Sequence, residues 1–270
     1  MGVLNLTPDS FSDGGRLDAP GAVVRQARRM LAQGAALLDL GAQSTRPGAA
    51  MVGPQEERRR LLPALQALQP LRVDHPQLLI SVDTFEASVA EAALAAGADW
   101  INDVRGANRT AGAAGGTLRD PAMLRLIAAT GCPYVLMHSR GTSQTMDSLA
   151  AYSDVVAEVR AELEAASEAA LAAGVKPEQL VWDPGLGFAK TTEQNLELLR
   201  RLPELSHAYP LLVGPSRKRF IGAVLNEPRP RARLWGTAAV CALAVSRGAR
   251  VLRVHDVGPI VQVAAMGAAL

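Results

Sequence analysis

The chain has few aromatic residues, few cysteines and no long apolar run. Aromatics make up 4% of 270 residues that are 49% hydrophobic, so alanine and leucine must fill most of the core. No run of about 18 apolar residues suggests a membrane span, and the start lacks the basic segment of a signal peptide. Cys132 and Cys241 share no motif and are typical of small buried side chains. We therefore expect a cytoplasmic protein that does not bind membranes.

An excess of one charge is also missing. The net charge is +2, and no basic stripe with interleaved aromatics occurs, so nucleic acid is not an expected partner. The charged run EERRR at 56–60 lies in a helical pattern. Its i,i+4 pairs indicate a solvated helix face rather than a binding patch.

The sequence is rich in one repeated unit, which consists of a helix end, a glycine, a short apolar strand and a polar residue. Glycine after a helix is the preferred left-handed cap, and a strand buried on both faces reads as a continuous apolar run. Such units predict a parallel sheet with right-handed crossovers. The polar residues then lie at the carboxyl ends of the strands, where α/β folds place their chemistry. Five copies end in Asp39, Asn102–Asp103, His138, Asp183 and Arg253–His255.

Three more strands complete a set of eight, at 2–6, 78–83 and 210–216; they end in Asn5, Asp83 and Ser216, and Lys218 follows. Helices are expected at about 20–33, 55–69, 86–96, 120–130, 153–173, 193–202, 232–247 and 257–268. Eight such pairs predict an α/β fold, a single-domain (β/α)8 TIM barrel over residues 1–270. An open doubly wound sheet is the alternative, but no G-x-G-x-x-G follows the first strand. Nothing before Met1 covers the amino-terminal end of this barrel, so we expect a shortened or misassigned start.

Two loops on the predicted catalytic face are too long to be plain connections. Loop one covers 7–16 and loop two covers 41–54, whereas ordinary βα loops run about two to six residues. Both contain glycine, proline, hydroxyls and charges, which is typical of lids over a site. The segment ANRTAGAAGGT at 107–117 is also long, and its composition predicts a mobile excursion.

These loops and strand ends resemble the dihydropteroate synthase family. GVLNLTPDSFSDGG at 2–15 resembles its opening signature, and STRPG at 44–48 resembles its second loop, although Gln43 stands where many members have Glu. The later blocks follow in the same order: SVDT at 81–84, INDV at 101–104, DPGLGF at 183–188, SRK at 216–218 and RVHD at 253–256. The resemblance implies a transferase of folate synthesis that joins 6-hydroxymethyl-7,8-dihydropterin diphosphate to p-aminobenzoate. The products are 7,8-dihydropteroate and diphosphate, and family members are typically homodimers.

The pterin would be held by carboxylate and amide groups at three strand ends. Its pyrimidine edge presents N–H donors. A carboxylate accepts hydrogen bonds from these donors, and an amide can both accept and donate. Asp183 and Asn102 supply these groups, with Asp83 nearby. Taken alone, Asp183 before Pro-Gly is equally a turn residue.

A diphosphate requires cations and a metal. The resemblance assigns this role to Arg46, Lys218, Arg253 and His255, with Thr45 beside them. Taken alone, Arg253 and His255 could be a surface pair closing the last strand. Asn5 resembles the family's Mg²⁺ contact, and one amide oxygen is enough because Mg²⁺ keeps waters and substrate phosphates as ligands. Mg²⁺ is thus the expected cofactor.

The p-aminobenzoate pocket is expected between loop two and the last strands. The family positions match Thr45, Pro47, Ser216 and Lys218, and Phe188 would stack on the ring, although Phe188 and Met137 could equally be core residues.

The reaction implied is a dissociative, SN1-like displacement at the pterin methylene. The catalytic residues would be Asp83, Asp183, Lys218, Arg253 and His255, with the carboxylates stabilising a carbocation and the basic groups the departing anion. Asp39 is expected to support these groups rather than contact substrate.

Three rivals remain on the same barrel. A non-catalytic pterin-binding protein could lose the loops and the anion site, and a pterin-dependent methyltransferase expels no diphosphate. The NLTPDSFSDGG motif of the first loop and the SRK motif at 216–218 are both present, which disfavours these two rivals. A metallohydrolase would need clustered histidines, and the four here contain no H-x-H.

Overall fold

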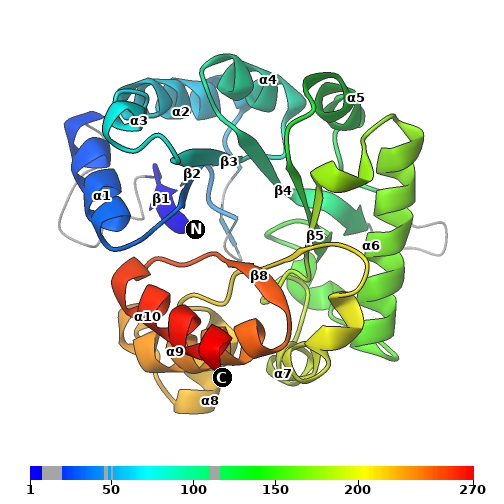
Figure 1. Cartoon of the computed structure of the whole chain (residues 1–270). Helices are drawn as coiled ribbons and strands as arrows, with labels where there is room; N and C mark the ends of the chain where they lie inside the picture. The colour runs from blue at the N-terminus through cyan, green and yellow to red at the C-terminus, as the bar shows by residue number, and fades with distance from the viewer. Residues whose placement is uncertain (8–19, 46–47, 50, 110–115) are drawn as a thin grey trace.

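The computed structural model describes residues 1–7, 20–45, 48–49, 51–109 and 116–270, which form one barrel (Figure 1). Eight parallel strands follow one another around the sheet in chain order. The last strand meets the first at Val254, whose carbonyl accepts from Val3 N at 2.9 Å and whose N–H donates to Met1 O at 3.0 Å. The sheet is therefore closed, which confirms the predicted TIM barrel over the open doubly wound sheet.

The strands are β1 (Gly2–Asn5), β2 (Leu37–Gly41), β3 (Leu79–Asp83), β4 (Trp100–Arg109), β5 (Tyr134–Arg140), β6 (Leu180–Asp183), β7 (Leu211–Val213) and β8 (Ala249–Leu252). The α-helices are α1 (Pro20–Ala32), α2 (Pro54–Leu68), α3 (Leu71–Asp74), α4 (Ala87–Ala95), α5 (Pro121–Thr130), α6 (Val155–Ala172), α7 (Thr192–Arg200), α8 (Arg219–Leu225), α9 (Leu234–Ser246) and α10 (Val257–Ala269). Short 3-10 helices are η2 (Met146–Leu149), η3 (Pro177–Gln179), η4 (Leu202–Leu205) and η5 (Pro230–Arg233). The helices surround the strands in Figure 1.

The glycines of the repeated unit adopt the backbone conformation that the sequence predicts. All five have positive φ, which costs glycine little because it has no Cβ. They are Gly34, Gly97, Gly131, Gly174 and Gly248. Each turns the chain from a helix into the next strand, and this repetition keeps the carboxyl ends of all strands on one face.

Alanine, leucine and valine fill the core, as the low aromatic content predicts. The two largest fully buried side chains are Trp182 and Tyr134, and both have a partner for their polar atom. Trp182 Nε1 donates to Ser167 Oγ at 2.8 Å, and the Tyr134 hydroxyl donates to Asp103 Oδ2 at 2.6 Å. Buried aromatics of this kind need such a partner. Cys132 and Cys241 are buried and unbridged, as expected.

The structure corrects three expectations. Strand β4 continues to Arg109, and Ala107–Arg109 pairs with β5 beyond a register shift, so the predicted mobile excursion is wrong there; residues 110–115 lie outside the described residues. Strand β7 ends at Val213, and Ser216 lies in the loop that follows it. Helices α3 and α8 were not predicted. None of the helices in the described part of the chain is long and apolar enough to cross a membrane.

The charged run of α2 is solvated only in part. Glu56 accepts from Arg59 Nε at 2.6 Å and from Arg60 Nε at 2.7 Å, as expected of an exposed face. Glu57 instead points inward and is 1% exposed, with its Oε2 lacking a partner among the described residues. The prediction of a solvated face is therefore wrong for Glu57, because the first turn of α2 packs against the end of β3, where Thr84 binds its carboxylate.

Candidate active site

The carboxyl ends of neighbouring strands bring the predicted pterin residues together. Asp83 ends β3 and is in register with Asn102 on β4 and with Gly41 on β2. Asp183 ends β6 and is in register with Met137 on β5. Parallel strands all end on one face, so residues up to 100 positions apart in the chain share one face of the barrel.

Arg253 crosses this face and binds two of the acids. Its Nε donates to Asp39 Oδ2 and its Nη2 to Asp83 Oδ2, both at 2.6 Å. Asp39 is fully buried, and its Oδ2 supports the arginine from inside the barrel. Burial would lower the pKa of Arg253, but the two carboxylates outweigh it and raise that pKa. Nη1 has no hydrogen-bond partner among the described residues and can take an anion.

Asn102 and Asp183 are buried, and each holds an oxygen ready for a ligand. Asn102 Oδ1 is shielded from solvent and has no partner among the described residues. Asp183 Oδ1 accepts from Gly185 N at 2.7 Å, and its other oxygen takes no hydrogen bond from those residues. Burial raises the pKa of Asp183, and Lys218 opposes that shift. The sequence allowed two interpretations of Asp183, a turn residue and a free hydrogen-bond acceptor, and the geometry is compatible with both.

His255, Ser216 and Asn5 form a second group beside Arg253. His255 Nδ1 lies 2.9 Å from Ser216 Oγ, and its Nε2 lies 3.5 Å from Asn5 Nδ2. Ser216 Oγ also accepts from His255 N at 3.2 Å. The serine thus orients the imidazole towards the end of β1, where the predicted metal contact lies.

Lys218 lies over the loop that follows β6. Its Nζ donates to the Leu186 carbonyl and lies 4.9 Å from the centre of the Phe188 ring. Burial lowers the pKa of Lys218 to about 8, and Asp183 limits the shift. The Lys218 ammonium therefore lies near both Asp183, the predicted pterin acceptor, and Phe188, which is predicted to stack on the ring of p-aminobenzoate.

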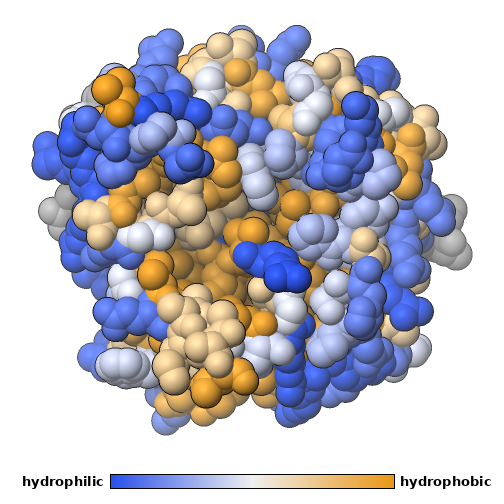
Figure 2. Space-filling model, in the orientation of Figure 1, coloured by the Kyte–Doolittle hydropathy of each residue, from blue (hydrophilic) through white to orange (hydrophobic). Residues whose placement is uncertain are grey.

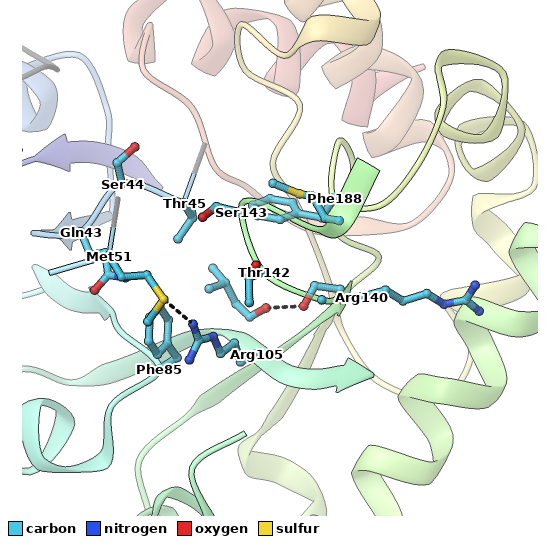
Figure 3. Close-up of a pocket in the computed structure, with 14 residues that line it drawn as sticks. Gln43, Ser44, Thr45, Met51, Phe85, Arg105, Arg140, Thr142, Ser143 and Phe188 are labelled. Carbon is cyan, nitrogen blue, oxygen red and sulfur yellow. Dashed lines mark hydrogen bonds between the residues drawn. The ribbon is translucent and has the colours of Figure 1, made fainter. Parts of the chain in front are cut away.

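A pocket opens between the loop after β2 and the ends of β3, β4 and β5 (Figure 3). Thr45 and Phe188 line it, but Ser216 and Lys218 do not. Phe85, Val104 and Met137 form an apolar cluster at this end of the barrel, and Phe188 packs against it. Phe188 and Met137 thus belong to a small cluster at the mouth rather than to the main core.

Arg105 and Arg140 both line this pocket but differ in orientation. Arg105 lies over the Phe85 ring at 3.6 Å and donates to Met51 Sδ at 3.4 Å. The Arg140 side chain points out of the pocket in Figure 3, towards Glu158 and Glu162 of α6. Only Arg105 therefore presents its charge at the pocket.

Two pocket residues, Phe85 and Arg105, were not predicted. They directly follow the SVDT and INDV blocks, and this position is a usable sequence signal. Gln43 lines the pocket, and its buried Oε1 has no hydrogen-bond partner among the described residues. Arg46, Pro47 and most of loop one lie outside the described residues.

The donor set suits a magnesium ion that arrives with an anion rather than a metal held by the protein alone. Among the described residues, no three His, Cys, Asp or Glu side chains form a metal-binding group. Asn5 has one amide oxygen to offer, and its amide nitrogen lies 3.5 Å from His255 Nε2. Mg²⁺ accepts such a site because waters and phosphate oxygens complete its shell.

The barrel carries two hydrogen-bond acceptors, Asn102 and Asp183, that suit a flat heterocycle, and basic side chains beside them that suit an anion. This combination is typical of a pterin-binding transferase. The family model "Pterin binding enzyme" matches residues 1–255. The dihydropteroate synthase of Synechocystis sp. is 47% identical over all of this chain and 89% of its own length. The chain belongs to the dihydropteroate synthase family.

Two solved structures agree with this assignment. The Xanthomonas albilineans dihydropteroate synthase with 4-aminobenzoic acid is 42% identical, with a TM-score of 0.87 over 100% of this chain and 91% of its own. The Yersinia pestis dihydropteroate synthase in a sulfonamide drug complex is 40% identical, with a TM-score of 0.90 over 100% and 92%. Both likenesses extend over the whole barrel, so the family assignment does not rest on isolated motifs.

Proposed function

We propose that this chain condenses 6-hydroxymethyl-7,8-dihydropterin diphosphate with p-aminobenzoate, releasing diphosphate and forming 7,8-dihydropteroate for folate synthesis. The observation that carries the proposal is the buried, unpartnered Asn102 Oδ1 in the same strand-end ring as Asp183. An orphaned buried oxygen costs free energy unless a ligand donor reaches it. The N–H edge of a pterin supplies such donors to both residues.

The first step is departure of diphosphate with the electron pair of the C–O bond. This leaves a cation at the pterin methylene, delocalised into the ring. Asp83 and Asp183 face that cation and stabilise it electrostatically. The amine nitrogen of p-aminobenzoate then forms the new C–N bond and loses one proton to diphosphate or water, which balances the reaction.

The departing anion needs positive charge on the opposite side of the methylene. Arg253 offers its free Nη1, and His255 and Lys218 lie nearby. We propose that Asn5 holds Mg²⁺ there, which would neutralise part of the diphosphate charge when bound. Thr45 and Phe188 line the pocket proposed for p-aminobenzoate, and the Xanthomonas relative was solved with 4-aminobenzoic acid.

Diphosphate release tests the proposal directly. Purified protein with dihydropterin diphosphate and Mg²⁺ should release diphosphate rapidly only when p-aminobenzoate is added, and dihydropteroate should form in equal amount. A non-catalytic pterin binder would release none. A methyltransferase would instead need a methyl donor and would leave the diphosphate intact. Absence of release at every p-aminobenzoate concentration would disprove the synthase assignment.

We also propose a cytoplasmic homodimer. Figure 2 shows apolar side chains gathered over α9 and α10, and Trp235 of α9 is 79% exposed. Val224 and Leu225 of the adjacent α8 are exposed too. An exposed apolar face of this kind is typical of an interface. Sedimentation should give twice the 28.4 kDa chain mass, and Trp235→Glu should shift it to the monomer.

A further inference from the structure

A buried lysine lies beneath the loop that carries Asp183 and Phe188. Lys190 is one of the chain's three lysines and is 8% exposed. Its Nζ donates to Gly185 O at 3.1 Å and to Phe188 O at 3.0 Å, and it lies 2.9 Å from His138 Nδ1. Three acceptors thus match the three N–H groups of an ammonium.

His138 links this lysine to Glu162 by a chain of two hydrogen bonds. An ammonium only donates, so His138 Nδ1 accepts and its Nε2 carries the proton, which it donates to Glu162 Oε2 at 3.0 Å. Burial, with Lys190 nearby, lowers the pKa of His138 to about 4, so the imidazole stays neutral. Hydrogen bonds from His138 and Arg140 outweigh the burial of Glu162 and lower its pKa to about 2. Burial lowers the pKa of Lys190 well below its ordinary value, and the nearby acids that oppose this shift are Asp183 and, more weakly, Glu162, which also pairs with Arg140.

Gly185 connects this buried group to the pterin acceptor. Its carbonyl receives the Lys190 hydrogen bond, while its N–H donates to Asp183 Oδ1. Its φ is +66°, and a Cβ there would lie 1.8 Å from His138 O, so the loop packs directly on β5. The Gly185 N–H thus helps to set the direction of the Asp183 carboxylate, and Lys190 holds the carbonyl of the same residue.

We propose that Lys190 is a positioning residue for pterin binding: through Gly185 it aims the free oxygen of Asp183, and through the Phe188 carbonyl it fixes the ring at the pocket. The inference rests on the proposed function, because Asp183 acts there as the pterin acceptor. A buried ion group is not needed for stability alone, since well-packed apolar replacements are often equally stable. The loop that it holds carries Asp183 at one end and Phe188 at the other, the two residues proposed to contact substrate.

The test is a double-mutant cycle read by calorimetry with 6-hydroxymethylpterin. Lys190→Met should weaken binding about tenfold or more, since charged hydrogen bonds orient the acceptor. In an Asp183→Asn background the same change should cost less than about threefold, because coupled residues are non-additive. Lys176→Met is the matched control, since that lysine is exposed, and it should leave the affinity unchanged.

Glu162→Gln serves if Lys190→Met does not fold, because its amide oxygen can still accept the hydrogen bond from His138, while the charge of Glu162 and its ion pair with Arg140 are lost. It should also weaken pterin binding and lose its effect beside Asp183→Asn. Additive effects for either pair would show that the buried group only supports the fold, and would overturn the inference. A wild-type protein that releases diphosphate while the cycle is additive would keep the proposed function and reject the role of Lys190. A wild-type protein that binds no pterin would reject both.

Discussion

Arg253 donates from Nη2 to Asp83 Oδ2 at 2.6 Å, so a cation of the proposed anion site and an acid of the proposed pterin site are one ion pair. Asp39 holds the same guanidinium from behind. The pair fixes the separation between these two parts of the proposed site before the substrate binds. Such preorganisation avoids reorganising charges during the reaction.

Loss of this arginine should destabilise the fold in a pH-dependent way. Arg253→Met leaves Asp39 and Asp83 buried without their cation, which costs about 3–5 kcal/mol near neutral pH. Burial already raises the pKa of Asp83, and without Arg253 it rises further. A raised folded-state pKa gives stability at low pH that is lost as pH rises.

Urea unfolding should therefore show a smaller deficit for Arg253→Met at pH 5 than at pH 8. Arg219→Met is the control, because Arg219 pairs with Asp147 on the surface at 2.9 Å. It should change stability by less than about 1 kcal/mol at either pH. An Arg253→Met variant as stable as wild type would mean that the acids are not held by this pair.

Asp183→Asn should weaken pterin binding without unfolding the chain. The amide keeps an oxygen for Gly185 N, so the turn survives. It loses the charge and presents a donor to a donor on the pterin, which costs about 1.5–3 kcal/mol. Calorimetry should show the loss while the melting temperature stays close to wild type. An unchanged affinity for the pterin would mean that Asp183 only stabilises the turn.

Glu57→Gln should stabilise the protein at high pH. Burial raises the pKa of Glu57 to about 7 from an ordinary 4.5. The folded state thus favours the protonated acid, and that contribution is lost as pH rises from about 4.5 to 7. Glutamine avoids the loss, so the variant should match wild type at pH 4 and gain about 3 kcal/mol at pH 8.

Glu56→Gln is the matched control for this change, one residue away on the exposed side of α2. Its partners Arg59 and Arg60 lower the pKa of Glu56 to about 2, so its removal should not help at any pH above 4. Unfolding at four pH values between 4 and 8 distinguishes the two variants. A flat difference for Glu57→Gln would show that this carboxyl is hydrated in solution.

Sulfonamides should compete with p-aminobenzoate and not with the pterin. Thr45 and Phe188 line one pocket, and the Lys218 ammonium lies near the Phe188 ring. The drugs share the aniline end of the natural substrate, and the Yersinia pestis relative was solved with one. Steady-state inhibition decides the point. Phe188→Ala should weaken the binding of the sulfonamide and of p-aminobenzoate together. Noncompetitive inhibition against p-aminobenzoate would show that the drug binds elsewhere.

The repeated glycine–strand unit allowed the barrel and the strand-end residues to be predicted, because both depend on local pattern. The sequence also placed Asp39 in a supporting position and offered a turn role for Asp183 before Pro-Gly, but the pairing of Asp39 with Arg253 is known only from the structure. Residues fixed by packing between distant segments could not be predicted this way. Lys190 and Glu57 are charged residues with no local mark of burial, and each is buried only because another element covers it.

The extension of β4 to Arg109 shows a second kind of limit. Gly106–Arg109 has no apolar run, so its sequence resembles a loop. It forms a strand because β5 also continues to Arg140 and offers it backbone partners. Ladder pairing of this kind depends on a neighbour's length, which no single segment encodes.

Closure of the sheet between β1 and β8 also determines when the enzyme can first work. Asn5 and His255 meet across that closure although 250 positions separate them. Protein synthesis proceeds at about 5–20 residues per second, so His255 is made roughly ten to fifty seconds after Asn5. A ribosome-bound chain lacking β8 would already contain Asp83, Asn102 and Lys218, but it would lack Arg253 and His255, which we propose take the leaving diphosphate.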